Sequence, residues 1–116
     1  MATYEEPCWS YAFNVGEGVA LHRFVGLDRD SRAVLPHGGP VYGVLEAMLE
    51  SGQGVVTTHD VVEVEVAEGE QIMCGPHRYV TTTVNGKARM AGRGDRCLGV
   101  AVDRNGDRVC VALMLR

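Results

Sequence analysis

The chain has 116 residues, of which 46% are hydrophobic and 22% charged, and a formal net charge of −4. A chain of this length and composition can bury the core of one folded domain, which excludes an intrinsically disordered protein. The acidic balance argues against a nucleic-acid-binding surface, which needs a basic face, and no apolar run is long enough to span a membrane. The first residues lack the basic start of a signal peptide, so we expect a protein made in the cytoplasm.

The cysteines and histidines are spread along the chain without the local ligand pairs of a metal site. The nearest approach to such a pair is the single segment Cys74-Gly75-Pro76-His77. We therefore expect reduced cysteines, no metal and no cofactor. A metal- or ligand-binding barrel that uses the histidines stays open as a third possibility, and its residues would be His22, His37, His59 and His77.

Residues 1–13 form a lead-in with aromatic side chains at alternate positions: Trp9, Tyr11 and Phe13. A period of two places them on one face of a strand. Two interpretations remain open, an extra strand of the domain or an N-terminal arm that packs on a neighbouring subunit. In either case these three aromatics are candidate interface residues, because large aromatic side chains dominate protein interfaces.

The first half of the remaining chain, residues 14–65, is predicted to consist of short strands. Strand signals cover 19–27, 33–35 and 55–58, with a polar turn at 28–32. Residues 41–51 are ambiguous, because Leu45 to Glu50 are good helix formers whereas Val41-Tyr42-Gly43-Val44 favour a strand. We favour a strand that ends in a turn or in one helical turn.

The clearest alternation in the chain spans the boundary between the halves, where valines alternate with glutamates through Val62-Glu63-Val64-Glu65-Val66. This pattern predicts a strand with a buried valine face and with Glu63 and Glu65 in solvent. Asn85-Gly86 predicts a tight hairpin between two further strands. Strand signals at 97–102 and 108–115 complete an all-β chain, a small barrel or sandwich of short antiparallel strands with little helix.

The chain also contains a faint internal repeat. Three segments recur in the same order, with an offset that drifts by a few residues as loop insertions would produce. We therefore expect a single domain, residues 14–116, of two similar halves at about 14–65 and 66–116, with Gly43 and Gly99 at equivalent close-packed positions. The matching segments are 15–18 with 66–69, 28–33 with 85–88, and 43–44 with 99–100.

Several segments resemble the capsid decoration (cement) proteins of tailed bacteriophages, of the DUF2190 type. The resemblance covers about residues 14–116, and its motifs are patterns of glycines, small residues and strands. The C-terminal half carries the larger part of it, and the first half contributes two segments. The segments are Gly94 to Val102, Asn85 to Ala88, Gly106 to Val111, Gly39 to Val44 and Val61 to Val64.

The resemblance implies a structural virion protein rather than an enzyme. Such a protein binds the outside of an icosahedral head and cements neighbouring major capsid proteins, often as a homo-trimer. It is made in the host cytoplasm and ends on the capsid exterior, without direct contact to nucleic acid or membrane. Multivalent contacts of this kind need a rigid scaffold rather than a reactive pocket.

An enzyme remains the alternative. His37-Gly38-Gly39, followed by the 41–49 segment, is similar to the turn that opens the central helix of hot-dog-fold acyl-CoA thioesterases. In that fold the helix N-terminus polarises the thioester carbonyl, and an acidic residue on the helix, here Glu46, acts as base or nucleophile. This alternative therefore requires a helix where we favour a strand.

Overall fold

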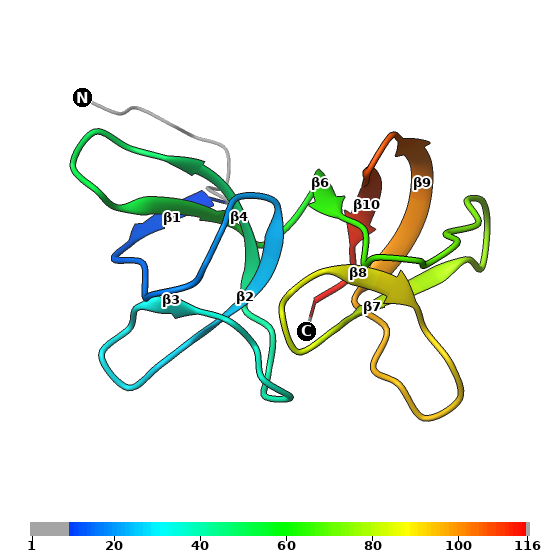
Figure 1. Ribbon diagram of the computed structural model, residues 1–116, viewed down its shortest axis with the longest axis horizontal. Helices are drawn as coiled ribbons and strands as arrows, with labels where there is room; N and C mark the ends of the chain where they lie inside the picture. Colours follow the sequence, from blue (N-terminus) through cyan, green and yellow to red (C-terminus); the bar gives the residue numbers. More distant parts are fainter. Residues whose placement is uncertain (1–9, 116) are drawn as a thin grey trace.

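The computed structural model describes residues 10–115, and within them every regular element is a β-strand. The strands form two five-stranded antiparallel sheets that lie side by side, the first drawn in blue to green and the second in green to red (Figure 1). The predicted all-β fold of two similar halves is confirmed. None of the described residues belongs to a helix that could cross a membrane.

The first sheet contains β1 to β5 in the order β1-β5-β4-β2-β3. Its strand β4 covers most of the ambiguous 41–51 segment, so the preference of Val41 to Val44 for a strand prevailed over the helix formers that follow. Residues 49–52 then turn the chain into β5. The bounds are β1 Ser10–Phe13, β2 Arg23–Leu27, β3 Ala33–Val34, β4 Gly43–Met48 and β5 Gly54–Thr57.

The second sheet has the order β6-β10-β9-β7-β8, which is the order of the first sheet once β1 is matched with β6, β2 with β7 and so on to β5 with β10. We call the two sheets with their loops the first and the second unit. The bounds are β6 Val61–Glu65, β7 Tyr79–Thr82, β8 Ala88–Met90, β9 Gly99–Asn105 and β10 Arg108–Leu113.

The match between the units extends to single backbone contacts. Each unit has one isolated parallel bridge, Val15 with Ala33 in the first and Val66 with Ala88 in the second. These four residues are the ones that the sequence repeat aligns. The same internal geometry has therefore been built twice from sequences that share few residues.

The hairpins that join β2 to β3 and β7 to β8 are equivalent in the same way. The backbone N–H of Arg32 donates to Asp28 Oδ1 over 2.9 Å, and that of Lys87 donates to Thr83 Oγ1 over 3.1 Å. An Asp and a Thr side chain thus close the same turn, as short polar side chains do in tight turns. The hairpin predicted at Asn85-Gly86 lies here.

Strand pairing shows more precisely than the repeated segments which residues belong to each half. β1 pairs with β5 inside the first sheet, so residues 10–13 are an edge strand of the first unit. β6 pairs with β10 and belongs to the second sheet, although residues 61–65 precede the boundary at 66 expected from the sequence. Residues 1–9 lie outside the described part of the chain.

Two glycines lie where neighbouring strands approach too closely for a side chain. A Cβ on Gly43 would lie 2.6 Å from the carbonyl oxygen of Thr57, and one on Gly99 would lie 2.5 Å from that of Ala112. Contacts this short require the backbone to move. Gly43 and Gly99 stand at the first residues of β4 and β9, which are matching strands.

The hydrophobic core has two parts of unequal make-up. The first unit encloses a small cluster of Val25, Ala33, Leu45 and Val56. The larger cluster lies in the second unit, but it also includes Phe24 and Val44 from the first. Because successive residues of a strand face opposite sides, β2 and β4 bury Val25 and Leu45 on one face and Phe24 and Val44 on the other.

Candidate functional site

The two units meet through different surfaces. The first unit contributes β2 and β4, with Phe24 and Val44 on their outer side and Arg23 at the start of β2, and we call this surface the front face. The second unit contributes β6, with Val62 and Val64 on its inner side and Glu65 at its end, and we call this surface the rear face. Phe24 and Val44 are fully buried in the cluster that contains Val62 and Val64, so the front face of one unit closes the core of the next.

Backbone hydrogen bonds tie the two faces together. The N–H of Glu65 donates to the carbonyl oxygen of His22 over 2.7 Å, and the N–H of Phe24 donates to that of Gly86 over 2.8 Å. His22 adopts a left-handed conformation, with φ of 63°, at the point where it accepts this bond. Residues that carry a side chain are uncommon at positive φ, and here the hydrogen bond from Glu65 holds His22 in this conformation.

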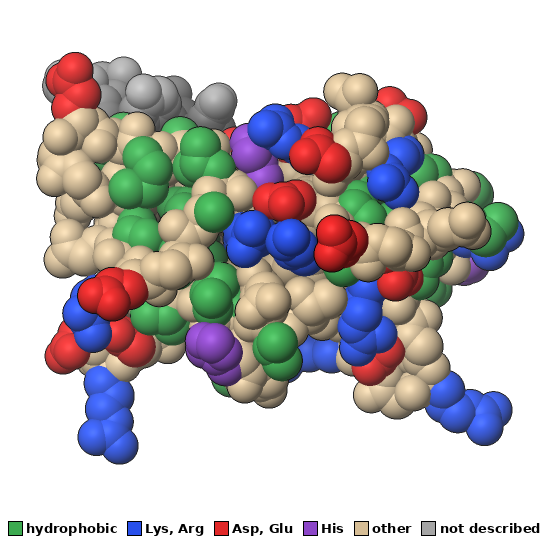
Figure 2. Space-filling view, viewed as in Figure 1, with side chains coloured by type: hydrophobic (Ala, Val, Ile, Leu, Met, Phe, Trp, Pro, Cys, Tyr) green, Lys and Arg blue, Asp and Glu red, His purple; other side chains and the backbone are tan. Residues whose placement is uncertain are grey.

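The carboxylate of Glu65 is the centre of the ionic contacts at this joint. Arg23 Nε lies 3.2 Å from Oε1 and Lys87 Nζ lies 3.3 Å from Oε2. Burial would raise the pKa of Glu65, but the hydrogen bonds and charges of Arg23 and Lys87 outweigh it and hold the pKa below its ordinary value. Basic and acidic side chains lie side by side over this boundary in the middle of Figure 2.

The expectation that Glu63 and Glu65 extend into solvent is therefore wrong for Glu65 and only partly right for Glu63. Glu65 is half-buried between two units. Glu63 is paired with Arg108, whose Nη1 lies 3.2 Å from Oε1, at a more exposed position. Alternation in the sequence identifies the two faces of β6 but does not show that another unit covers one end of the strand.

The first unit carries an aromatic cluster on the surface that corresponds to the rear face. Within the described residues, no front face covers it. The rings of Phe13 and Tyr42 meet edge to face with centroids 5.4 Å apart, and the centroids of Tyr11 and Phe13 are 6.5 Å apart. Tyr11 is 45% exposed and Phe13 is half-buried. Hydrophobic side chains gather over this unit on the left of Figure 2. Trp9, the third predicted interface residue, lies outside the described residues.

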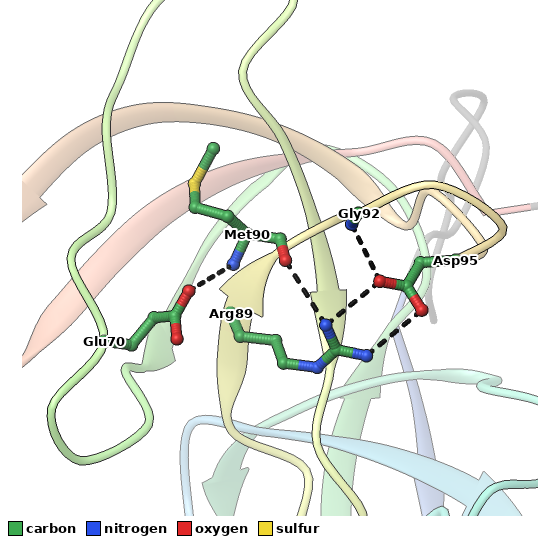
Figure 3. Close-up of polar contacts among 5 residues, drawn as sticks. All are labelled: Glu70, Arg89, Met90, Gly92 and Asp95. Atoms are coloured by element: carbon green, nitrogen blue, oxygen red, sulfur yellow. Dashed lines mark hydrogen bonds and ion pairs between the residues drawn. The ribbon is translucent and has the colours of Figure 1, made fainter.

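A depression of about 420 Å³ lies between the two units, lined by the 38–41 loop of the first and by β7, β8 and residues 95–98 of the second. Arg89, one of the charged residues that line it, donates two hydrogen bonds of 3.0 and 3.2 Å to Asp95 (Figure 3). The N–H of Gly92 also donates to Asp95 over 2.7 Å, and Glu70 accepts from the N–H of Met90 over 3.0 Å.

These contacts stabilise an edge of the second sheet and do not form a reactive centre. The hydrogen bonds from Arg89 and from the Gly92 N–H hold the pKa of Asp95 below its ordinary value, so this carboxylate stays ionised and paired. A general acid or base needs a pKa near the working pH, which this carboxylate does not have. The sequence offered no sign of the pair, since Arg89 and Asp95 lie on opposite sides of a glycine-bearing turn.

The residues of the thioesterase alternative are not brought together. His37, Gly38 and Gly39 form an exposed turn, and the segment that follows is strand β4. Glu46 is exposed at the irregularity in the pairing of β4 with β5. The central helix which that mechanism requires is not present among residues 10–115.

The histidines and cysteines remain scattered in the folded chain. Within the described residues there is no group of three or more His, Cys, Asp or Glu side chains that could hold a metal ion. Burial, aided by the nearby Glu63, Asp103 and Cys74, raises the pKa of the Cys110 thiol. A thiol with a raised pKa is a poor nucleophile, since the thiolate is the reactive form.

Comparisons of the chain with protein-family models, with curated proteins and with solved structures gave no match.

Proposed function

We propose that the protein is a structural subunit that binds the outside of an icosahedral phage head and cements neighbouring major capsid proteins. The single observation that carries the proposal is the partly exposed aromatic cluster of Tyr11, Phe13 and Tyr42 on a rigid β scaffold. Exposed aromatic side chains grouped on one surface are characteristic of binding surfaces.

Two further features support this proposal. The segments that resemble cement proteins, 39–44, 61–64, 85–88, 94–102 and 106–111, build β4, β6, the β7–β8 turn, β9 and β10, so they belong to the scaffold and its turns. In the depression between the units, Arg89 and Asp95 are paired with each other, which suits a stabilised sheet edge better than a substrate site.

In this proposal the protein acts by contact. A subunit with separate surfaces for the shell and for its neighbours gains affinity from effective concentration, without a catalytic group or a cofactor. Trp9, Tyr11 and Phe13 are the proposed residues of an interface with the capsid or with a neighbouring subunit. The major capsid protein is the proposed partner, and a homo-trimer on the capsid exterior is the proposed assembly. The protein would be made in the host cytoplasm.

Binding to expanded capsids that lack their own decoration protein tests the proposal. The purified chain should co-sediment with such capsids at micromolar concentration and should raise the temperature at which they release their DNA. A chain without residues 1–9, which keeps β1, should bind more weakly if Trp9 contributes to the contact. Failure of the complete chain to bind any such capsid would contradict the proposal.

The enzyme alternative has its own control in the same preparation. Acyl-CoA hydrolysis by the purified chain, lost in Glu46→Ala, would replace the structural proposal by the thioesterase. We expect no hydrolysis above the uncatalysed rate in either protein, because Glu46 is an exposed residue of strand β4 and not part of a helix that follows the His37 turn.

A further inference from the structure

The contact between the two units is heterologous, because it joins the front face of one unit to the rear face of the other. Gly86 of the second unit is buried against Phe24, whereas Ser31, its counterpart in the first unit, is exposed at the hairpin tip. A two-fold contact would bury both. A heterologous contact leaves one face of each kind unused, here the front face of the second unit and the rear face of the first.

We propose that a second copy of this chain occupies these unused faces, with the rear face of its first unit on the front face of the second unit. Each copy would then continue the joint that already exists inside the chain. The inference rests on the proposed function only in that the copies would meet on the capsid. The contact between them needs no capsid.

The unused front face keeps the backbone geometry of the engaged one. Phe24 pairs across the strands with Val44, and their counterparts Tyr79 and Val100 pair in the same register. Tyr79 and Val100 are apolar side chains left half-buried where Phe24 and Val44 are fully buried. This face therefore has a similar shape but lacks a cover within the described chain.

The accepting backbone group is also repeated. His22, whose carbonyl oxygen accepts the hydrogen bond from Glu65, has φ of 63°, and its counterpart His77 has φ of 64°. This conformation is unfavourable for a residue with a side chain. The second unit thus repeats at His77 the left-handed backbone conformation that His22 has at the joint.

The unused rear face is apolar where the engaged one is apolar. Tyr11 and Phe13 stand at the positions of Val62 and Val64, which are almost fully buried at the joint. The larger aromatic side chains leave Tyr11 45% exposed. Tyr11 and Phe13 of one copy can thus receive Tyr79 of another as Val62 and Val64 receive Phe24.

One polar contact of the joint can recur between the unused faces, whereas Asn14 stands at the position of Glu65 and carries no charge. Arg23 of the engaged front face donates from Nη1 to the carbonyl oxygen of Asn85 in the β7–β8 hairpin over 3.1 Å. Its counterpart in the second unit is the exposed Arg78, and the counterpart of Asn85 is Asp30, whose carboxylate is exposed. A neighbouring copy would place Arg78 beside an acidic residue, which favours this pairing over one between like faces.

Sedimentation velocity of the full chain over a concentration series tests the inference. The wild type should associate with increasing concentration, into a closed ring if the rotation between copies closes and into an open chain of copies otherwise. Tyr79→Glu breaks the front face and Tyr11→Asp breaks the rear face, and each alone should weaken association by about 30-fold or more, as loss of an interface anchor does. Arg78→Glu, at an exposed position, is the second front-face variant should Tyr79→Glu fail to fold.

A mixture of Tyr79→Glu and Tyr11→Asp is the decisive experiment. Each variant retains one intact face, so an equimolar mixture should form a one-to-one dimer that grows no further. Asn105→Glu, which adds the same charge at the exposed end of β9, should associate as the wild type does. A monomeric wild type, or association unaffected by Tyr11→Asp or by Tyr79→Glu, would overturn the inference, whatever the capsid experiment gives.

Discussion

At the scale of single residues, Glu65 shows how one carboxylate can connect two structural units. It is held by Arg23 from β2 and by Lys87 from the β7–β8 hairpin, both far from it in the sequence. Its own backbone N–H binds His22. Replacing the carboxylate therefore changes the joint without changing either sheet.

We predict that Glu65→Gln lowers the free energy of unfolding by about 1 kcal/mol at neutral pH, the size of a partly exposed, charge-assisted contact. The matched control is Glu63→Gln on the same strand, whose single partner Arg108 is more exposed, with an expected loss of about 0.5 kcal/mol or less. Urea denaturation of the three proteins measures both values. An equal loss in the two variants would contradict the role assigned to Glu65.

The contribution of Glu65 should also disappear in acid. Its pKa is lower in the folded protein than in the unfolded chain, so the stabilisation is complete above the ordinary glutamate value of about 4.3 and is lost as the pH falls through the folded value. The stability difference between the wild type and Glu65→Gln should therefore be constant near neutral pH and shrink below about pH 4. A difference that stays constant in acid would show that the loss comes from packing.

At the scale of elements, the duplication supplies matched positions in different surroundings. Phe24 on β2 and Tyr79 on β7 have the same place in the two sheets, but only Phe24 is covered by another unit. The contribution that burial by the other unit makes to the free energy of unfolding can thus be measured by substituting Phe24 and Tyr79 in turn.

We predict that Phe24→Ala costs about 3–5 kcal/mol of unfolding free energy, as removal of a buried aromatic side chain does, and that Tyr79→Ala costs about 1 kcal/mol. Phe24→Leu, with an expected cost of about 1 kcal/mol, serves if the alanine variant does not fold. Denaturation at concentrations where the chain is monomeric gives these values. Similar costs for Phe24→Ala and Tyr79→Ala would mean that the joint contributes little to stability.

The strands themselves were largely predictable, and the reasons are local. The Val–Glu alternation predicted β6, Asn85-Gly86 predicted the β7–β8 hairpin, and recurring segments predicted two similar halves, since turn chemistry and period-two patterns act over a few residues. The joint was not predictable, because Phe24 and Val25 are both apolar and nothing in β2 shows that each faces a different core. The Arg23–Glu65 and Arg89–Asp95 pairs were missed for the same reason: they depend on tertiary contacts.

At the scale of the whole molecule, the shared core predicts cooperative unfolding. The second unit depends on Phe24 and Val44 to complete its core, so the two units cannot separate without exposing both sides of the joint. We expect one calorimetric transition with an enthalpy of about 80 kcal/mol near 60 °C, equal to the van't Hoff enthalpy. Two resolved transitions would show instead that each unit is stable alone.

The unequal division of the core also has a consequence for synthesis. The first unit encloses Val25, Ala33, Leu45 and Val56 without help from the second, so its own core is complete in sequence once β5 has left the ribosome. At that moment Phe24 and Val44 still lack their cover, which arrives only with β6 and the strands after it. During translation the nascent chain therefore presents an apolar surface, and a chaperone or a neighbouring nascent chain can bind it before the second unit does.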